Sequence, residues 1–174
     1  MFYMDPESLL MDLIKEGLRS ADPYEAVKRN LRIDKEYILI KDQYQIKRRR
    51  THVIGFGKSS VGMVRAVVDL LGEDVVGGVA ISVDKELRIG PVEVVRGDHP
   101  IPSINTERAS KKLIEYIRSN INENDLAIVL ISGGGSALFE VPLEGVELRD
   151  IAEISEMLMK AGADIIELNT VRKH

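Results

Sequence analysis

The sequence predicts an α/β fold in which helices flank a mainly parallel sheet. Three observations lead to this prediction. Apolar segments of strand length alternate with segments of helical periodicity, two of the strands end in glycine-rich turns, and no repeat or low-complexity tract interrupts the pattern. With 174 residues, of which 44% are hydrophobic and 30% charged, the chain has the size of one domain and can bury a substantial core.

The amino-terminal part is predicted to hold two helices and a hairpin. Residues 5–19 form an amphipathic helix that starts at Asp5-Pro6, because apolar residues recur at helical spacing: Leu9, Leu10, Leu13, Ile14 and Leu18. A shorter helix is expected at residues 23–31. Two alternating segments, residues 37–40 and 44–46, flank the letters KDQ and are typical of a small hairpin.

The central part predicts the beginning of the parallel sheet. A strand at residues 52–54 ends at Gly55, and a helix follows that closes at Gly72 and has apolar residues at spacings of three and four: Val61, Val64, Val68 and Leu71. Further strands are expected at residues 75–83 and 92–95.

The carboxyl-terminal part adds a strand and three helices. The first helix follows the letters GDHPIPSINT and carries an apolar face made of Ala109, Leu113, Tyr116 and Ile117. Residues 126–131 are a continuous apolar run, which predicts a strand buried on both faces. Two more helices are expected at residues 148–161 and from residue 164 to the terminus. The alternation of strands and helices indicates a Rossmann-like sheet.

Composition and charge restrict the classes of function. The formal charge of −4 and the pI of about 5.5 predict no bulk attraction to nucleic acid or to an anionic membrane. The basic cluster at residues 47–50 is interpreted as the solvated start of a strand, with an anion or partner contact as the alternative. The absence of cysteine excludes disulfides and thiolate metal sites. Without a secretory signal or a membrane-length apolar run, the cytoplasm is the expected location, and the composition resembles that of thermophilic proteins.

Two glycine-rich loops follow predicted strands, GFGKSS at residues 55–60 and SGGGS at residues 132–136. Loops at the carboxyl ends of parallel strands lie on one edge of the sheet, so the two could face one cleft. Glycine lets a ligand approach the backbone amides closely, and a helix amino end favours phosphate or carboxylate. The triple glycine is therefore either an anion cradle or a tight turn.

The first loop matches neither of the common phosphate fingerprints. A P-loop would need glycine at position 52, where the chain has His52, and a dinucleotide fingerprint would need glycine at position 60, where it has Ser60. What remains is Lys58, the only cation of the loop. Its ammonium group could neutralise charge on a transferring phosphoryl group, or it could simply be solvated at the start of a helix.

Two further segments carry polar groups that could line a cleft. In RGDHPIPS, two prolines stiffen the backbone around Asp98 and His99, so His99 either lines the cleft or is a surface residue of a rigid connector. A single histidine without a second ligand nearby does not predict a metal site. The carboxyl-terminal letters IIELNTVRKH place Asn169, Arg172 and Lys173 within reach of one helix face, although a solvated helix end has the same pattern.

Taken in this order, the four segments resemble the glycerate 2-kinases of the family whose carboxyl-terminal domain is called MOFRL. The matching stretches lie between residues 55 and 174 and read GFGKSSVGM, DHPIPS, ISGGGSALFEVP and AGADIIELNTVRKH. The combination of SGGGSAL, a proline shortly after it and ExNxVRKH further along the chain is specific, whereas either piece alone would be weak.

The resemblance implies an enzyme that transfers the γ-phosphoryl group of ATP to the 2-hydroxyl of D-glycerate. It also implies a divalent metal such as Mg²⁺ and an active site in the cleft between two α/β domains. Lys58 matches the family's catalytic lysine and would stabilise the transferring group or help to ionise the glycerate hydroxyl. Phosphoryl transfer mainly requires positioning and positive charge around the equatorial oxygens, which agrees with these residue types.

The resemblance also assigns the other site residues. The glycine loop would bind glycerate carboxylate or nucleotide phosphate through its amides and hydroxyls: Ser132, Gly133, Gly134, Gly135 and Ser136. Gly55 and Gly57 belong to the same predicted anion site. Asn169, Arg172 and Lys173 would lie at the cleft, with Glu167 supporting them, and Arg172 would be the bidentate partner of a carboxylate or phosphate.

The chain departs from the family pattern at several points. Ser59 stands where the family commonly has alanine, and Ser103 stands where it commonly has aspartate, which removes a carboxylate from the HPIP loop. Family members are much longer and continue past VRKH into a second domain. Residues 1–174 are therefore expected to be an incomplete amino-terminal domain that, without the carboxyl-terminal domain, has little or no kinase activity.

Two other classes of function compete with the kinase. A non-catalytic module that binds a phosphosugar or nucleotide would need only the SGGGS loop and the parallel sheet. An NAD-dependent reductase is disfavoured, because Ser60 breaks the dinucleotide fingerprint and the acidic residue that should end a second strand is not at the expected distance.

Overall fold

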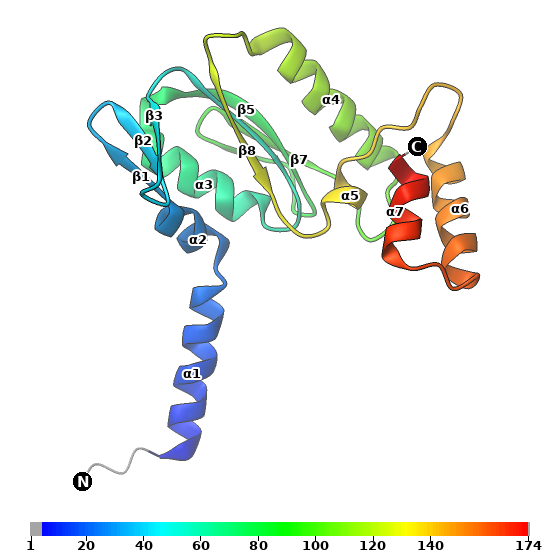
Figure 1. Cartoon of the computed structure of the whole chain (residues 1–174), viewed down its shortest axis with the longest axis horizontal. Coiled ribbons are helices and arrows are strands. Elements are labelled where there is room, and N and C mark those ends of the chain that lie inside the picture. The colour runs from blue at the N-terminus through cyan, green and yellow to red at the C-terminus, as the bar shows by residue number, and fades with distance from the viewer. Residues whose placement is uncertain (1–4, 174) are drawn as a thin grey trace.

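A computed structural model describes residues 5–173, which form two sheets and a set of surrounding helices (Figure 1). The helices are α1 (Pro6–Ser20), α2 (Pro23–Asn30), α3 (Ser60–Leu71), α4 (Ile104–Asn120), α5 (Gly135–Leu138), α6 (Leu148–Lys160) and α7 (Ile165–Lys173), with the short 3-10 helix η1 (Gly72–Asp74). The strands are β1 (Leu31–Asp34), β2 (Tyr37–Ile40), β3 (Tyr44–Lys47), β4 (Thr51–Phe56), β5 (Val75–Ser82), β6 (Leu87–Ile89), β7 (Val92–Arg96) and β8 (Leu126–Ile131).

The larger sheet has the strand order β6-β7-β5-β4-β8, and only β6 runs antiparallel to its neighbour. Phe56 at the end of β4 is opposite Ile131 at the end of β8. The predicted fold class, a mainly parallel sheet flanked by helices, is confirmed. Its topology brings the loops after β4 and β8 to the same edge of the sheet.

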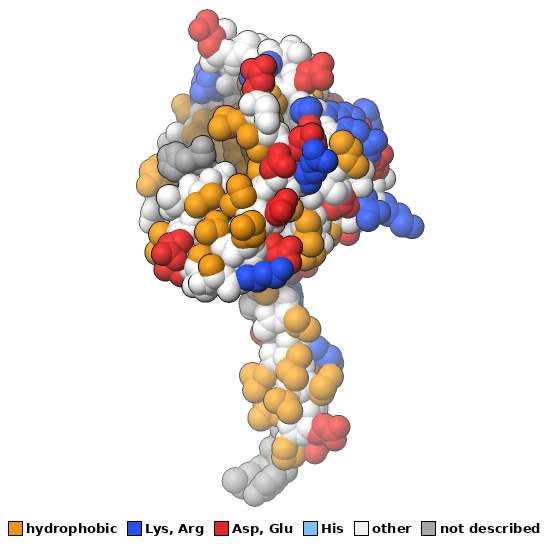
Figure 2. All heavy atoms as spheres, turned by 90° about the vertical axis from the view of Figure 1, so that its right-hand side faces the viewer, with side chains coloured by type: hydrophobic (Ala, Val, Ile, Leu, Met, Phe, Trp, Pro, Cys, Tyr) orange, Lys and Arg blue, Asp and Glu red, His pale blue; other side chains and the backbone are white. Residues whose placement is uncertain are grey.

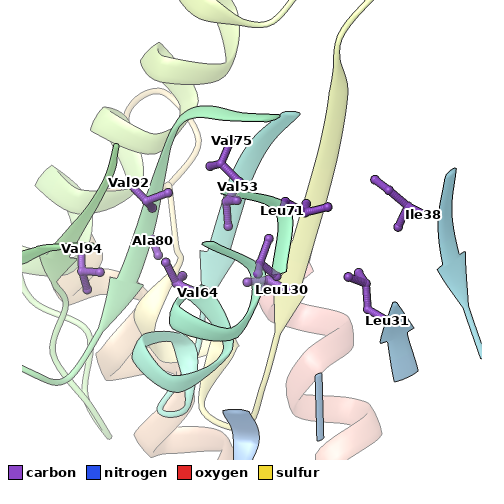
Figure 3. Packing of buried hydrophobic residues seen from close by; sticks show 11 residues of the cluster. Leu31, Ile38, Val53, Val64, Leu71, Val75, Ala80, Val92, Val94 and Leu130 are labelled. Carbon is purple, nitrogen blue, oxygen red and sulfur yellow. The ribbon is translucent and has the colours of Figure 1, made fainter. Parts of the chain in front are cut away.

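Two hydrophobic clusters hold the sheet between its helices. On one face, α3 packs against β4, β5 and β8 through residues such as Val53, Val64 and Leu130 (Figure 3). On the other face, α4 packs against β5 and β7 through Ala109 and Leu113. Because the two faces bury separate clusters, the loops at the strand ends extend from a rigid platform.

The prediction that residues 126–131 are buried on both faces is wrong. β8 is an edge strand whose Leu130 is buried in the α3 cluster, whereas Val129 and Ile131 on its other face are 53% and 61% exposed. The reason is the position of α4, which packs mainly against β5 and β7 and leaves this face of β8 exposed. A continuous apolar run identifies the strand without telling which faces its neighbours cover.

The amino-terminal elements form largely as expected, with one added strand. Asp5 and Asp22 cap α1 and α2, accepting hydrogen bonds from the amides of Ser8 (3.1 Å) and Glu25 (3.0 Å). The hairpin β2-β3 gains a third antiparallel strand, β1, which begins at Leu31, where the helix was expected to end. None of the residues of α1 is buried, and Figure 2 shows this helix projecting from the body with apolar side chains on its surface.

The basic cluster at residues 47–50 contributes two structural ion pairs. Arg48 Nε lies 2.6 Å from Asp74 Oδ2, and Arg50 Nε lies 3.2 Å from Asp125 Oδ1. These pairs tie the start of β4 to η1 and to the loop before β8, which supports the interpretation as a strand start. Within residues 5–173, no helix combines the length and the hydropathy that a bilayer crossing requires.

Candidate functional site

The two glycine-rich loops lie against each other and are joined by hydrogen bonds. The Lys58 amide donates to the carbonyl of Gly133 (2.9 Å) and the Ser59 amide donates to Ser132 Oγ (3.1 Å). In the opposite direction, the Ser132 amide donates to the carbonyl of Phe56 (3.2 Å). The two loops are thus in direct contact at one edge of the sheet, and a shared cleft stays a prediction.

Gly57 makes this contact possible. Its φ is +130°, and a Cβ atom at this position would lie 2.2 Å from Ser132 Oγ and 2.7 Å from the Ser132 carbonyl oxygen. Any side chain would therefore push the two loops apart, in addition to the strain of a backbone conformation that favours glycine. Gly57 is required by packing between loops.

The amides of the first loop are already engaged by protein acceptors. Besides the amides of Lys58 and Ser59, the Gly57 amide donates to the Ile81 carbonyl (3.2 Å) and the Ser60 amide to the Gly57 carbonyl (3.2 Å). Gly55 lies within β4 and is buried, where a Cβ atom would come within 3.2 Å of Ala80 Cβ. Gly55 and Gly57 therefore serve close packing in this structure, and their contact with an anion stays a prediction.

The second loop differs because its amides are free. Among residues 5–173, no protein acceptor takes a hydrogen bond from the four consecutive amides of Gly133, Gly134, Gly135 and Ser136. Gly134 has a φ of +82°, and this left-handed residue turns the chain at the start of α5. Successive free amides around such a turn form a concave group of donors that suits an anion.

Lys58 and His99 lie beside the same turn. A Cβ atom built on Gly134 would be 3.2 Å from Lys58 Cε, 2.8 Å from His99 Cδ2 and 3.0 Å from His99 Nε2. The ammonium-bearing chain of Lys58 is exposed, and His99 is partly exposed. The structure thus brings Lys58, His99 and the free amides together, although they come from three separate segments.

The loop before α4 is held by a network around Asp98. The carboxylate accepts hydrogen bonds from Ser103 Oγ and from Asn105 Nδ2 (2.9 Å), while the Asp98 amide donates to Thr106 Oγ1 (3.0 Å). The pKa of Asp98 is lowered, first by the Ser103 hydrogen bond and further by Asn105 and Arg96, whereas burial acts in the opposite direction. Ser103 also caps α4. An aspartate at 103 would place a second carboxylate beside Asp98.

The carboxyl-terminal helix contacts the glycine loop through Arg172. The guanidinium of Arg172 donates to both carboxylate oxygens of Glu140, from Nε at 3.3 Å and from Nη2 at 2.9 Å, and Nη2 also donates to the Ser136 carbonyl (2.8 Å). Arg172 was predicted to bind a substrate anion, yet its guanidinium is largely occupied by a carboxylate of the protein. Sequence reasoning missed Glu140, because nothing in the order of residues pairs it with a residue so distant along the chain.

The other predicted residues of α7 have separate positions. Glu167 caps its own helix: Glu167 Oε2 accepts from the Asp164 amide (2.9 Å), and Asp164 Oδ1 accepts from the Glu167 amide (2.9 Å). Asn169 is partly buried and Lys173 is exposed. Arg172 and Lys173 line one end of a largely apolar pocket of about 370 Å³ between α6, α7 and the segment after α5.

Comparison with known proteins identifies the family. The family model described as "Domain of unknown function (DUF4147)" matches residues 9–174. The chain belongs to this family. The chain is also 39% identical to the glycerate 2-kinase of Pyrococcus horikoshii and 35% identical to the D-glycerate 2-kinase of Thermotoga maritima. These alignments cover 100% and 98% of the chain but only 39% of either relative.

A solved structure extends the similarity to three dimensions. The crystal structure of a protein from Pyrococcus horikoshii matches with a TM-score of 0.85 and 36% sequence identity, over 100% of this chain and 39% of the other. The resemblance to glycerate kinases is thereby confirmed, and the chain spans about two fifths of the length of the relatives it matches.

The described residues show no preformed cluster of ligands for the Mg²⁺ that the family resemblance implies. Mg²⁺ prefers carboxylate oxygens with octahedral geometry, but the carboxylates that adjoin the glycine loop are engaged, Asp98 by Ser103 and Glu140 by Arg172. Among the described side chains, no cluster of three or more His, Asp or Glu could hold a metal. Lys58 places a cationic side chain beside Gly134.

Proposed function

We propose that the chain supplies one wall of the active site of a glycerate kinase, which transfers the γ-phosphoryl group of ATP to the 2-hydroxyl of D-glycerate and forms 2-phosphoglycerate. One observation carries this proposal: the four free amides of Gly133 to Ser136 lie beside the Lys58 side chain. The names of the family members that the chain resembles support the choice of substrates.

In this mechanism, the glycine loop holds an anionic group of ATP or glycerate through its amides. The glycerate hydroxyl oxygen attacks the γ-phosphorus, the bond from that phosphorus to the bridging oxygen of ADP breaks, and the hydroxyl proton passes to solvent water. Lys58 stabilises the negative charge on the transferring group and the attacking oxygen. His99, beside the same turn, lines the cleft. Asn169 and Lys173 of α7 bind an anionic group of glycerate or ATP.

We further propose that the 174-residue chain alone has little or no kinase activity. The chain corresponds to 39% of the length of its relatives, and the free amides lie at the edge of the sheet where β4 and β8 end. Phosphoryl transfer depends on positive charge on several sides of the phosphoryl group. The free amides and Lys58 alone would bind an anion, but they would not align ATP and glycerate for transfer.

The test compares two polypeptides in a coupled assay of ADP formation with D-glycerate: the 174-residue chain and the longest polypeptide that its gene encodes. The longest form should turn over and the 174-residue chain should not. In the longest form, Lys58→Ala should lower kcat at least about a hundredfold, whereas Lys160→Ala on exposed α6 should leave it unchanged. Normal turnover by the 174-residue chain would refute the proposed inactivity, and full activity of Lys58→Ala would refute the role of Lys58.

A non-catalytic binding module is the second candidate, because the free amides alone could hold the phosphate of a nucleotide or phosphosugar. The same assay separates the two. A binding module would bind ATP or a phosphosugar in the longest form and yield no phosphorylated product, and Lys58→Ala would then have no turnover to lose.

A further inference from the structure

The short helix α5 follows the free amides and ends after four residues. Its last carbonyls accept hydrogen bonds from side chains of other elements, and not from the amides that would continue the helix. In a continuing helix the Ser136 carbonyl would accept from the Glu140 amide. That amide donates instead to Ser110 Oγ of α4, at 3.0 Å. The carbonyls of Ser136 and Ala137 are taken by two side chains, Arg172 at 2.8 Å and Thr106 at 3.2 Å.

The Arg172–Glu140 pair is well enclosed. The side chains are 17% and 10% exposed, and the carboxylate receives two nitrogens of one guanidinium, Nε and Nη2. Such forked pairs fix the orientation of both partners. Ser110 of α4, fully buried, anchors the backbone of Glu140. The chain of contacts therefore runs from α4 through Glu140 and Arg172 to the glycine loop.

We infer that Arg172 is a positioning residue: it holds the carbonyl end of the turn at Ser136, so that the amides of Gly133 to Ser136 converge on one anion. The inference rests on the proposed anion-binding role of this loop. It reassigns Arg172, since a guanidinium that is engaged by Glu140 and by the Ser136 carbonyl acts on the anion through the loop. The alternative is a direct contact from Nη1, the guanidinium nitrogen that has no hydrogen bond within residues 5–173.

The two roles predict opposite effects of Glu140→Gln. If Arg172 contacted the anion directly, this substitution would release the guanidinium and remove a nearby negative charge, so anion affinity would rise. If Arg172 positions the loop, the neutral amide holds the guanidinium less well and affinity should fall about tenfold. Arg172→Lys should weaken binding similarly, because one ammonium group cannot reproduce the fork to Glu140 together with the bond to Ser136.

Pyrophosphate binding to the 174-residue chain, followed by ¹H–¹⁵N NMR, measures this effect. Both variants should also shift the Gly133–Ser136 amide signals before pyrophosphate is added, while the β4 amides stay protected from hydrogen exchange. In a double-mutant cycle, Glu140→Gln with Arg172→Lys should weaken binding by no more than either change alone. The controls are Glu86→Gln and Arg108→Lys, which alter an exposed pair on the sheet periphery and should leave affinity unchanged.

Three results would overturn the inference: tighter binding by Glu140→Gln, unchanged affinity in both variants, or no binding of pyrophosphate to the loop of the unaltered chain. If the variants change the free energy of unfolding but leave pyrophosphate affinity unchanged, the inference also fails, and the Arg172–Glu140 pair has only a structural role. The kinase proposal is judged separately, by turnover of D-glycerate in the longest encoded polypeptide, and its failure leaves the affinity measurement intact.

Discussion

The loop after β4 and the loop after β8 are both rich in glycine, yet the structure gives their glycines different tasks. In the first loop, Gly55 and Gly57 let backbones approach, and the amides are used within the protein. In the second loop, the amides from Gly133 to Ser136 have no acceptor in the described part of the chain. A glycine-rich loop is therefore a candidate anion site only when its backbone amides remain free to donate hydrogen bonds to a ligand.

The largest effect is expected from Gly57→Ala in the first loop. A Cβ atom 2.2 Å from Ser132 Oγ at a φ of +130° should lower the free energy of unfolding by about 3 kcal/mol or more, from overpacking and backbone strain. Urea denaturation followed by circular dichroism measures it. A stability within about 0.5 kcal/mol of the unaltered chain, the range of neutral surface changes, would show that the loops are not pressed together at Gly57.

An intermediate effect is expected from Gly134→Ala in the second loop. The alanine would adopt a left-handed φ of +82° and press on His99 and Lys58, which should cost about 1–2 kcal/mol of unfolding free energy. Because both neighbours are side chains that can move, the cost should stay below that of Gly57→Ala. The same denaturation series ranks the two, and a reversed order would contradict the assigned contacts.

A smaller, pH-dependent effect is expected from Ser103→Ala beside the second loop. Loss of the helix cap and of the hydrogen bond to Asp98 should cost about 1 kcal/mol at pH 7. The folded pKa of Asp98 is lowered, so its ionised form adds stability above the unfolded pKa of about 3.9, and this contribution disappears as the pH falls through the folded pKa.

The penalty of Ser103→Ala should therefore be larger at pH 7 than in acid. Unfolding of the variant and of the unaltered chain at pH 7 and at a pH well below the unfolded pKa of Asp98 gives the two differences. A penalty that grows in acid would contradict the assigned charge of Asp98.

The smallest effect is expected from Gly133→Ala. No atom lies within 4 Å of a Cβ built there, and Gly133 is not among the residues with positive φ. The unfolding free energy should change by no more than about 0.5 kcal/mol. The variant is thus the matched control for Gly57→Ala. A loss of unfolding free energy as large as that of Gly57→Ala would show that the packing at Gly57 does not distinguish the two loops.

The sequence was sufficient to predict the sheet class and the location of both loops, because apolar periodicity and glycine punctuation are local signals. It could not tell which amides are free, since that depends on bonds between Lys58 and Gly133, which belong to different loops. It also could not pair Glu140 with Arg172, or expose the outer face of β8, because both depend on how distant elements pack. Ser103 departs from the family pattern, and the sequence alone does not show that its hydroxyl donates a hydrogen bond to Asp98.

An NMR titration of the 174-residue chain with pyrophosphate, read at every backbone amide, shows directly which of the two loops binds an anion. We expect saturable shifts at Gly133, Gly134, Gly135 and Ser136 and at the Lys58 side chain, with the amides of residues 57–60 much less affected. Shifts centred on residues 57–60, or no saturable shift in either loop, would contradict this expectation.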